Sequence, residues 1–204
     1  MKKLLPYIAM AVFSFLVCGS STSAQFRDGD LIFQTSLSEQ NIAIQRATHS
    51  KYSHMGIIFF QNGSPYVYEA VATVRHTPLK EWIARGEGGH YVVKRLRDSE
   101  RLLTPEAVAK LRKAAAGFHG KPYDPTFEWS DERMYCSELV WKIYDRGLGI
   151  QVGKLRKLRD FDLSDPLVKA KIKERYGDQV PLDETVISPG DMFSFEGLTA
   201  VAQQ

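Results

Sequence analysis

The chain has little cysteine: only Cys18 and Cys136 occur among its 204 residues. Cys18 lies in an apolar N-terminal segment that we expect to be removed, which leaves Cys136 alone in the mature chain. A single cysteine excludes an intrachain disulfide, and an unpaired thiol in an oxidising compartment is open to oxidation and mispairing. Cys136 therefore needs either burial as a structural thiol or a chemical role.

The sequence also lacks a linker, an internal repeat and a marked net charge. No Pro-, Ser- or Gly-rich stretch divides residues 25–204, which predicts one domain. The 27 basic residues nearly balance the 24 acidic ones, and the expected cleavage would remove two of the lysines. A dispersed, balanced charge argues against a nucleic-acid partner. The histidines are scattered, so we expect neither a metal site nor a cofactor.

Residues 1–24 have the layout of a secretory signal peptide. Two lysines precede an apolar run, Leu4–Val17, and small polar residues follow as far as Ala24. The apolar run is too short for a comfortable membrane span. We therefore predict cleavage after Ala24 and export to a periplasmic or other extracytoplasmic space. Lipoprotein anchoring through Cys18 is the weaker alternative, because the bulky residue before it fits a lipidation site poorly.

Hydrophobic patterns and turn signals in the remaining 180 residues predict an α+β domain. The best-marked unit is a hairpin around Asn62-Gly63, a dipeptide typical of two-residue turns. The tail after Val180 is expected to be mostly loop, with a helical turn after Ser188-Pro189. The predicted strands cover residues 30–34, 53–60, 66–72 and 91–96, and the predicted helices cover residues 36–48, 79–84, 104–120, 136–146 and 165–177.

Cys136 is predicted to open a helix, which gives its thiol a distinctive environment. The first N–H groups of a helix have no intrahelical partner, and together with the helix dipole they favour a thiolate. The same amides can stabilise the oxyanion of a tetrahedral intermediate formed on the sulfur. Many structural cysteines also begin helices, so this position alone decides nothing.

The hairpin places a histidine and a carboxylate together. An even loop around Asn62-Gly63 pairs residues whose numbers sum to 125, so that Gly56 faces Glu69 and His54 is a diagonal neighbour of Glu69 on the same face. Gly56 leaves the space between them free of a side chain. A carboxylate that binds one ring nitrogen can present the other nitrogen to a thiol. We therefore expect Cys136 as nucleophile, His54 as base and Glu69 as the group that orients it.

Several segments of the sequence resemble the YiiX-like branch of the NlpC-like cysteine peptidase superfamily. The likeness covers nearly the whole mature chain. It is carried by Gly29-Asp-Leu-Ile-Phe33, Tyr52-Ser-His-Met-Gly-Ile57, Tyr68-Glu-Ala70, Gly120-Lys-Pro-Tyr-Asp124 and Tyr135-Cys-Ser-Glu-Leu-Val140.

The resemblance implies a circularly permuted papain-like fold, with an antiparallel sheet packed against helices and the histidine ahead of the cysteine. It implies the same three residues, Cys136, His54 and Glu69, as the catalytic group. Glutamate stands where better-known cell-wall peptidases often have a second histidine or another polar group, and no wall-binding repeat is present. The resemblance therefore leaves the substrate open.

Our leading interpretation is a cysteine hydrolase that cleaves an amide bond in a cell-wall (peptidoglycan) peptide. A lipid acyl hydrolase or acyltransferase is an alternative, which predicts an apolar channel lined by residues 153–191. A non-catalytic binding module is another. Tyr135, Tyr123 and Trp129 flank the proposed nucleophile and are expected to line a substrate groove, although they could equally pack the loop against the core. The basic run Lys154–Arg159 leaves contact with a membrane surface open.

Overall fold

A six-stranded antiparallel sheet forms the centre of the protein. The computed structural model describes residues 26–204, so the predicted signal peptide and Cys18 lie outside the described residues. The strand order is β4-β3-β2-β1-β5-β8, and each neighbouring pair is antiparallel. The strands are β1 (Leu31–Gln34), β2 (His54–Gln61), β3 (Ser64–Ala70), β4 (Val74–Pro78), β5 (Val92–Leu96) and β8 (Leu198–Gln203).

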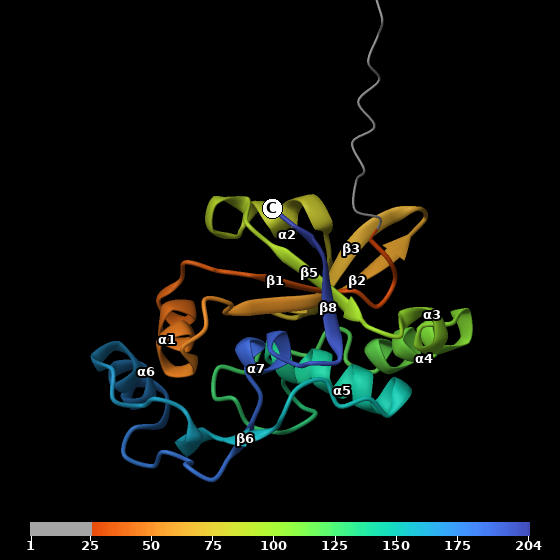
Figure 1. Ribbon diagram of the computed structural model, residues 1–204. Helices are drawn as coiled ribbons and strands as arrows, with labels where there is room; N and C mark the ends of the chain where they lie inside the picture. The colour runs from red at the N-terminus through yellow and green to blue at the C-terminus, as the bar shows by residue number, and fades with distance from the viewer. Residues whose placement is uncertain (1–25) are drawn as a thin grey trace, which may run out of the picture.

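Helices cover both faces of this sheet, as Figure 1 shows. Helix α2 (Leu79–Ala84) packs on one face, and α5 (Cys136–Leu148) packs on the other with α4 and α7 beside it. The remaining helices are α1 (Glu39–Thr48), α3 (Ser99–Leu102), α4 (Pro105–Ala116), α6 (Pro166–Tyr176) and α7 (Pro189–Phe193), with short 3-10 turns at Glu87–Gly89 and Leu158–Asp160.

Helix starts follow the capping residues in the sequence. The Ser38 hydroxyl accepts the Asn41 amide at the start of α1, and the Asp165 carboxylate accepts the Leu167 amide at the start of α6. A small two-stranded ribbon of β6 (Arg156–Lys157) and β7 (Thr185–Val186) ties the 153–191 segment together. Among the described residues, no helix combines the length and the apolar character that a membrane crossing requires.

The hairpin has the predicted register. Ile57 pairs with Tyr68 and Ile58 pairs with Val67, so the paired numbers sum to 125. The two-residue turn has positive φ at both Asn62 and Gly63, as a type I′ turn requires. The register sets His54 and Glu69 on one face of the sheet.

Helix α5 is the most deeply buried helix and carries the proposed nucleophile at its first position. Its first nine residues, Cys136 to Tyr144, are all buried, so packing surrounds this half of the helix. The larger core lies between α5 and the sheet face that includes Leu31, Met55 and Tyr68, whereas a smaller core lies under α2 around Trp82. The N-terminus of α5 is therefore held by the body of the protein.

Two strands of the six-stranded sheet lie outside the predicted set, and so do both strands of the small ribbon, β6 and β7. β8 falls in the tail that was expected to be loop, and it pairs with β5 at the edge of the sheet. β4 extends the opposite edge by pairing with β3. Arg75 and His76 interrupt the apolar pattern of β4, and β8 carries two alanines, so long-range pairing outweighs weak local preference in both strands.

Gly56 is a packing constraint within the hairpin, and Gly56→Ala is expected to destabilise the protein. A Cβ at this position would lie 2.4 Å from Val67 Cγ1 and 2.7 Å from the Tyr68 carbonyl oxygen. Urea unfolding should show a loss of about 1–3 kcal/mol. Gly117→Ala is the matched control, since its nearest contact is 3.4 Å away and its φ of −66° is helical. Equal stability of the two variants would contradict this account.

Candidate active site

Cys136 occupies the first position of α5 and is 4% exposed. Its sulfur lies beside the unpaired amides of the first helical turn, which favour negative charge. The Ser137 hydroxyl donates to the Ile187 carbonyl, and the Ile187 amide donates to the Tyr135 hydroxyl. The residues on either side of Cys136 are thus fixed to the chain segment opposite.

His54 and Glu69 form a buried pair on the neighbouring strands β2 and β3. His54 Nε2 lies 2.6 Å from Glu69 Oε2, and His54 also shares a side-chain hydrogen bond with Cys136. Because Nε2 is engaged by Glu69, the imidazole presents Nδ1 to the thiol. The buried Trp82 ring stacks on the imidazole at a centroid distance of 5.8 Å and excludes water from that side.

The second oxygen of Glu69 is held by two further donors. The Thr77 hydroxyl donates to Oε1 over 2.6 Å, and the Arg85 guanidinium also donates to Oε1. A fully buried carboxylate needs such partners to remain ionised. Glu69 is therefore fixed in both position and charge, and it fixes the imidazole in turn.

The environment favours a protonated His54 beside Cys136. Burial lowers the pKa of His54, but hydrogen bonds to Cys136 and Glu69 outweigh burial and raise this pKa to about 9. Burial raises the pKa of Glu69, but the His54 hydrogen bond and charge, the Thr77 hydroxyl and the Arg85 charge lower it to about 2. At neutral pH the pair is therefore an imidazolium and a carboxylate.

Tyr123 lines the same hollows as Cys136 and carries a hydroxyl. Its oxygen accepts a hydrogen bond of 2.5 Å from the Gln40 amide, and burial raises the Tyr123 pKa, so that the phenol stays protonated. The following residue, Asp124, fixes the turn by accepting from the Thr126 and Glu128 amides. Tyr123 can therefore donate its proton to an oxyanion formed at Cys136.

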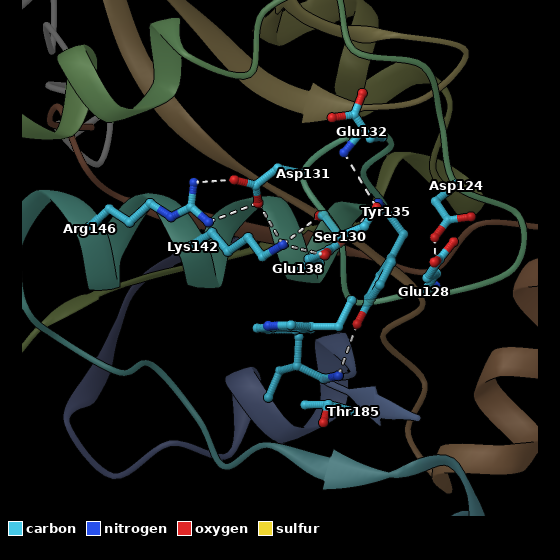
Figure 2. Close-up of polar contacts among 12 residues, drawn as sticks. Asp124, Glu128, Ser130, Asp131, Glu132, Tyr135, Glu138, Lys142, Arg146 and Thr185 are labelled. Carbon is cyan, nitrogen blue, oxygen red and sulfur yellow. Dashed lines mark hydrogen bonds and ion pairs between the residues drawn. The ribbon is translucent and has the colours of Figure 1, made fainter. Parts of the chain in front are cut away.

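A partly buried ion network ties the loop before Cys136 to helix α5, as Figure 2 shows. Lys142 Nζ donates to Glu138 Oε1 over 2.8 Å, to Asp131 Oδ1 over 3.0 Å and to the Ser130 carbonyl over 2.5 Å. Arg146 binds both oxygens of Asp131. Glu138 also accepts the Tyr135 amide at the start of the helix. The network holds the approach to the nucleophile in place.

Two hollows open beside Cys136. The apolar hollow, about 770 Å³ including its mouth, lies between α1, the start of α5 and residues 158–189. The polar hollow, about 640 Å³ including its mouth, contains both His54 and Cys136 in its wall. Its other lining residues are Gln34, Ser36, Ser38, Gln40, Asn41, Ser53, Ala70, Val71, Arg85 and Tyr123.

The three residues expected to line a substrate groove differ in where the structure places them. Tyr123 lines both hollows and Tyr135 lines the apolar one. Trp129 lines neither of these two hollows. Its ring packs edge-on against Trp141 at 5.3 Å and beneath Lys142 Nζ at 4.8 Å, and it belongs to the packing around α5.

Sequence reasoning missed Thr77, Arg85 and Gln34. Thr77 lies on β4, a strand that was not predicted, so no pairing could be counted to it. Arg85 follows α2 and reaches Glu69 only in the folded chain. Gln34 ends β1 directly opposite His54 in the register, and pairing the predicted strand 30–34 with the hairpin would have found it.

The fold and this constellation agree with the comparisons with known proteins. Residues 25–202 match a family described as "Permuted papain-like amidase enzyme, YaeF/YiiX, C92 family". The chain belongs to this family. It is 50% identical over 195 residues to the uncharacterized protein YiiX of Escherichia coli K12, covering 96% of this chain and 95% of that protein. The permuted papain-like fold and the cysteine-hydrolase class predicted from the sequence are confirmed.

A solved structure gives the same fold. The metalloprotein yiiX from Escherichia coli O157:H7 superposes with a TM-score of 0.83 and 54% identity over 87% of this chain and 97% of that chain. That protein is described as a metalloprotein. Within residues 26–204 of this chain, no three His, Cys, Asp or Glu side chains gather to hold an ion.

Cys136 is expected to react faster with iodoacetamide at pH 6 than free cysteine does, because protonated His54 lies beside it. His54→Ala should slow the reaction at pH 6 by about 100-fold, since an ordinary thiol with a pKa near 8.5 is scarcely ionised there. Mass spectrometry of the Cys136 peptide measures both rates. His90→Ala, at an exposed histidine, should have no effect, and a wild-type rate at pH 6 as slow as that of free cysteine would refute the activated pair.

The Glu138 carboxyl should make stability depend on pH. Burial raises its pKa to about 7 although Lys142 opposes the shift, so the native state keeps a proton that the unfolded chain loses near pH 4.5. Stability should therefore fall as pH rises from 4.5 through 7, by roughly 3 kcal/mol. Glu138→Gln should abolish this slope in urea unfolding, whereas Glu132→Gln, at an exposed carboxylate, should keep it. The same slope in wild type and Glu138→Gln would show the assignment to be wrong.

Proposed function

We propose that this protein is an exported cysteine amidase whose substrate is an amide with an aliphatic acyl chain. Cys136 is the nucleophile, His54 carries the proton and Glu69 orients His54. The apolar hollow that ends at Cys136 is the observation that favours an aliphatic acyl group. Export rests on the signal-peptide layout of residues 1–24.

The apolar hollow is walled largely by aliphatic and aromatic side chains from distant parts of the chain. Helix α1 contributes Ala43, Ile44 and Ala47, and helix α6 contributes Val168 and Ile172. The rest of the apolar wall consists of Phe127, Leu158, Phe161, Leu163, Val186, Ile187 and Pro189. Residues 158–189 thus supply the apolar lining that an acyl hydrolase requires.

Burial of an acyl chain here gives a measurable free energy. Each buried methylene contributes about 0.8 kcal/mol, which corresponds to about a fourfold gain in binding. A cell-wall peptide is polar along its length and would bury little apolar surface in this hollow. The lining therefore favours an aliphatic acyl group over a peptide.

The proposed reaction uses groups that the fold brings together. The Cys136 thiolate attacks the carbonyl carbon, and the Cys136 amide with the Tyr123 hydroxyl stabilises the oxyanion. The carbon–nitrogen bond breaks as His54 gives its proton to the departing amine. Water then attacks the thioester and passes a proton to His54, the carbon–sulfur bond breaks, and the acid leaves.

The dependence of kcat/KM on the length of the substrate's acyl chain tests this proposal. We expect kcat/KM for N-acyl derivatives of one amine to rise from acetyl through hexanoyl to dodecanoyl, by about fourfold per methylene until the hollow is filled. Ala47→Phe should narrow the hollow. It should lower kcat/KM for the dodecanoyl substrate at least tenfold and leave kcat/KM for the acetyl substrate unchanged. Ala116→Phe, at an exposed position of α4, should leave the series intact.

Other outcomes separate the rival functions. Cleavage rates that do not depend on acyl-chain length, together with faster cleavage of a cell-wall peptide, would contradict the aliphatic substrate and favour a peptidoglycan amidase. Transfer of the acyl group to an added alcohol or amine in preference to water would identify an acyltransferase. Retention of the biological effect by Cys136→Ser, without turnover, would favour a binding module.

A further inference from the structure

The polar hollow lies on the side of Cys136 where the leaving group must depart. His54 lines the polar hollow and does not line the apolar one. Because the departing nitrogen takes its proton from His54, it has to lie on the His54 side of the sulfur. If the acyl chain occupies the apolar hollow, as proposed above, the amine half of the substrate occupies the polar hollow.

The charge in the wall of the polar hollow favours a leaving amine that carries a negative group. Arg85 is a cation in its wall with a side chain that is 38% exposed, and no described Asp or Glu lines the hollow. A guanidinium has five N–H donors in a planar fork, and the bond to Glu69 uses one of them. The others suit a carboxylate, whereas a cationic amine would meet no opposite charge.

Gln34 adds a polar group to the same wall. Its side chain is 2% exposed, and its Oε1 has no hydrogen-bond partner among the described residues. Such a buried acceptor is costly unless a donor reaches it. Gly86 makes room for this oxygen, since a Cβ there would lie 2.5 Å from Gln34 Oε1.

We propose that the polar hollow binds the amino-acid half of an N-acyl amino acid, with Arg85 holding its carboxylate. This specificity rests on the function proposed above. The bond broken is the amide carbon–nitrogen bond. The products are a fatty acid and a free amino acid, with water as the co-reactant.

The test compares two substrates that share one acyl chain. N-dodecanoyl-alanine carries the carboxylate, and N-dodecanoyl-alaninamide replaces it with a neutral amide. Wild type should favour the carboxylate by about tenfold in kcat/KM, mainly through KM. Arg85→Gln should bring the ratio within about twofold of one, even if its overall activity falls through the contact with Glu69.

Lys80→Gln removes a charge from an exposed position on α2 and serves as the matched control. It should keep the tenfold ratio. A wild-type ratio near one, or a ratio that Arg85→Gln leaves at tenfold, would overturn the proposal. Both results are independent of the absolute activity of each variant.

A second measurement tests carboxylate binding in the polar hollow independently of the preference for a long acyl chain. N-acetyl-alanine should slow alkylation of Cys136 by iodoacetamide, and N-acetyl-alaninamide should do so about tenfold less well. Arg85→Gln should remove this difference. Carboxylate-dependent protection without cleavage of the dodecanoyl substrates would retain the polar-hollow specificity and refute the aliphatic amidase, whereas cleavage without carboxylate preference would do the reverse.

Discussion

The hydrogen bond between His54 and Glu69 is the interaction on which the site depends. It requires the β2–β3 register, because a slip of one residue would turn the two side chains to opposite faces. Asn62-Gly63 sets that register through the turn, and Gly56 keeps the intervening space clear. Thr77 and Arg85 then hold the carboxylate ionised. The turn preference of Asn62-Gly63 thus sets the register that places a protonated His54 imidazole beside the Cys136 thiol.

Helix α5 brings the other half of the site to this pair. Its deep burial fixes the first turn, and the Glu138–Lys142–Asp131 contacts attach the preceding loop to the same helix. Cys136 thus stands where an apolar hollow and a polar hollow meet. His54 lines only the polar hollow, so the function proposed above places the acyl group in the apolar hollow and the departing amine in the polar one.

The sequence was most informative where the signals were local. The Asn-Gly turn predicted the register that joins His54 to Glu69, and the capping residues Thr104 and Asp165 marked the helix starts that the structure shows. β8 escaped prediction because its strand conformation comes from pairing with β5, about a hundred residues away in the chain. The acyl-hydrolase alternative predicted an apolar channel lined by residues 153–191, but the contribution of α1 to that wall and the polar hollow could not be predicted, because they combine distant parts of the chain. Periodicity reports which face of an element is apolar, but not which distant element will cover it.

Trapping the acyl-enzyme tests the central claim most directly. Wild-type protein mixed with an N-dodecanoyl amino acid would be quenched in acid within milliseconds, digested and analysed by mass spectrometry. We predict one dodecanoyl group on the Cys136 peptide of the wild type, less of it in His54→Ala and none in Cys136→Ala. Cleavage of the substrate without an acyl group on Cys136, or with the group on another residue, would contradict the mechanism.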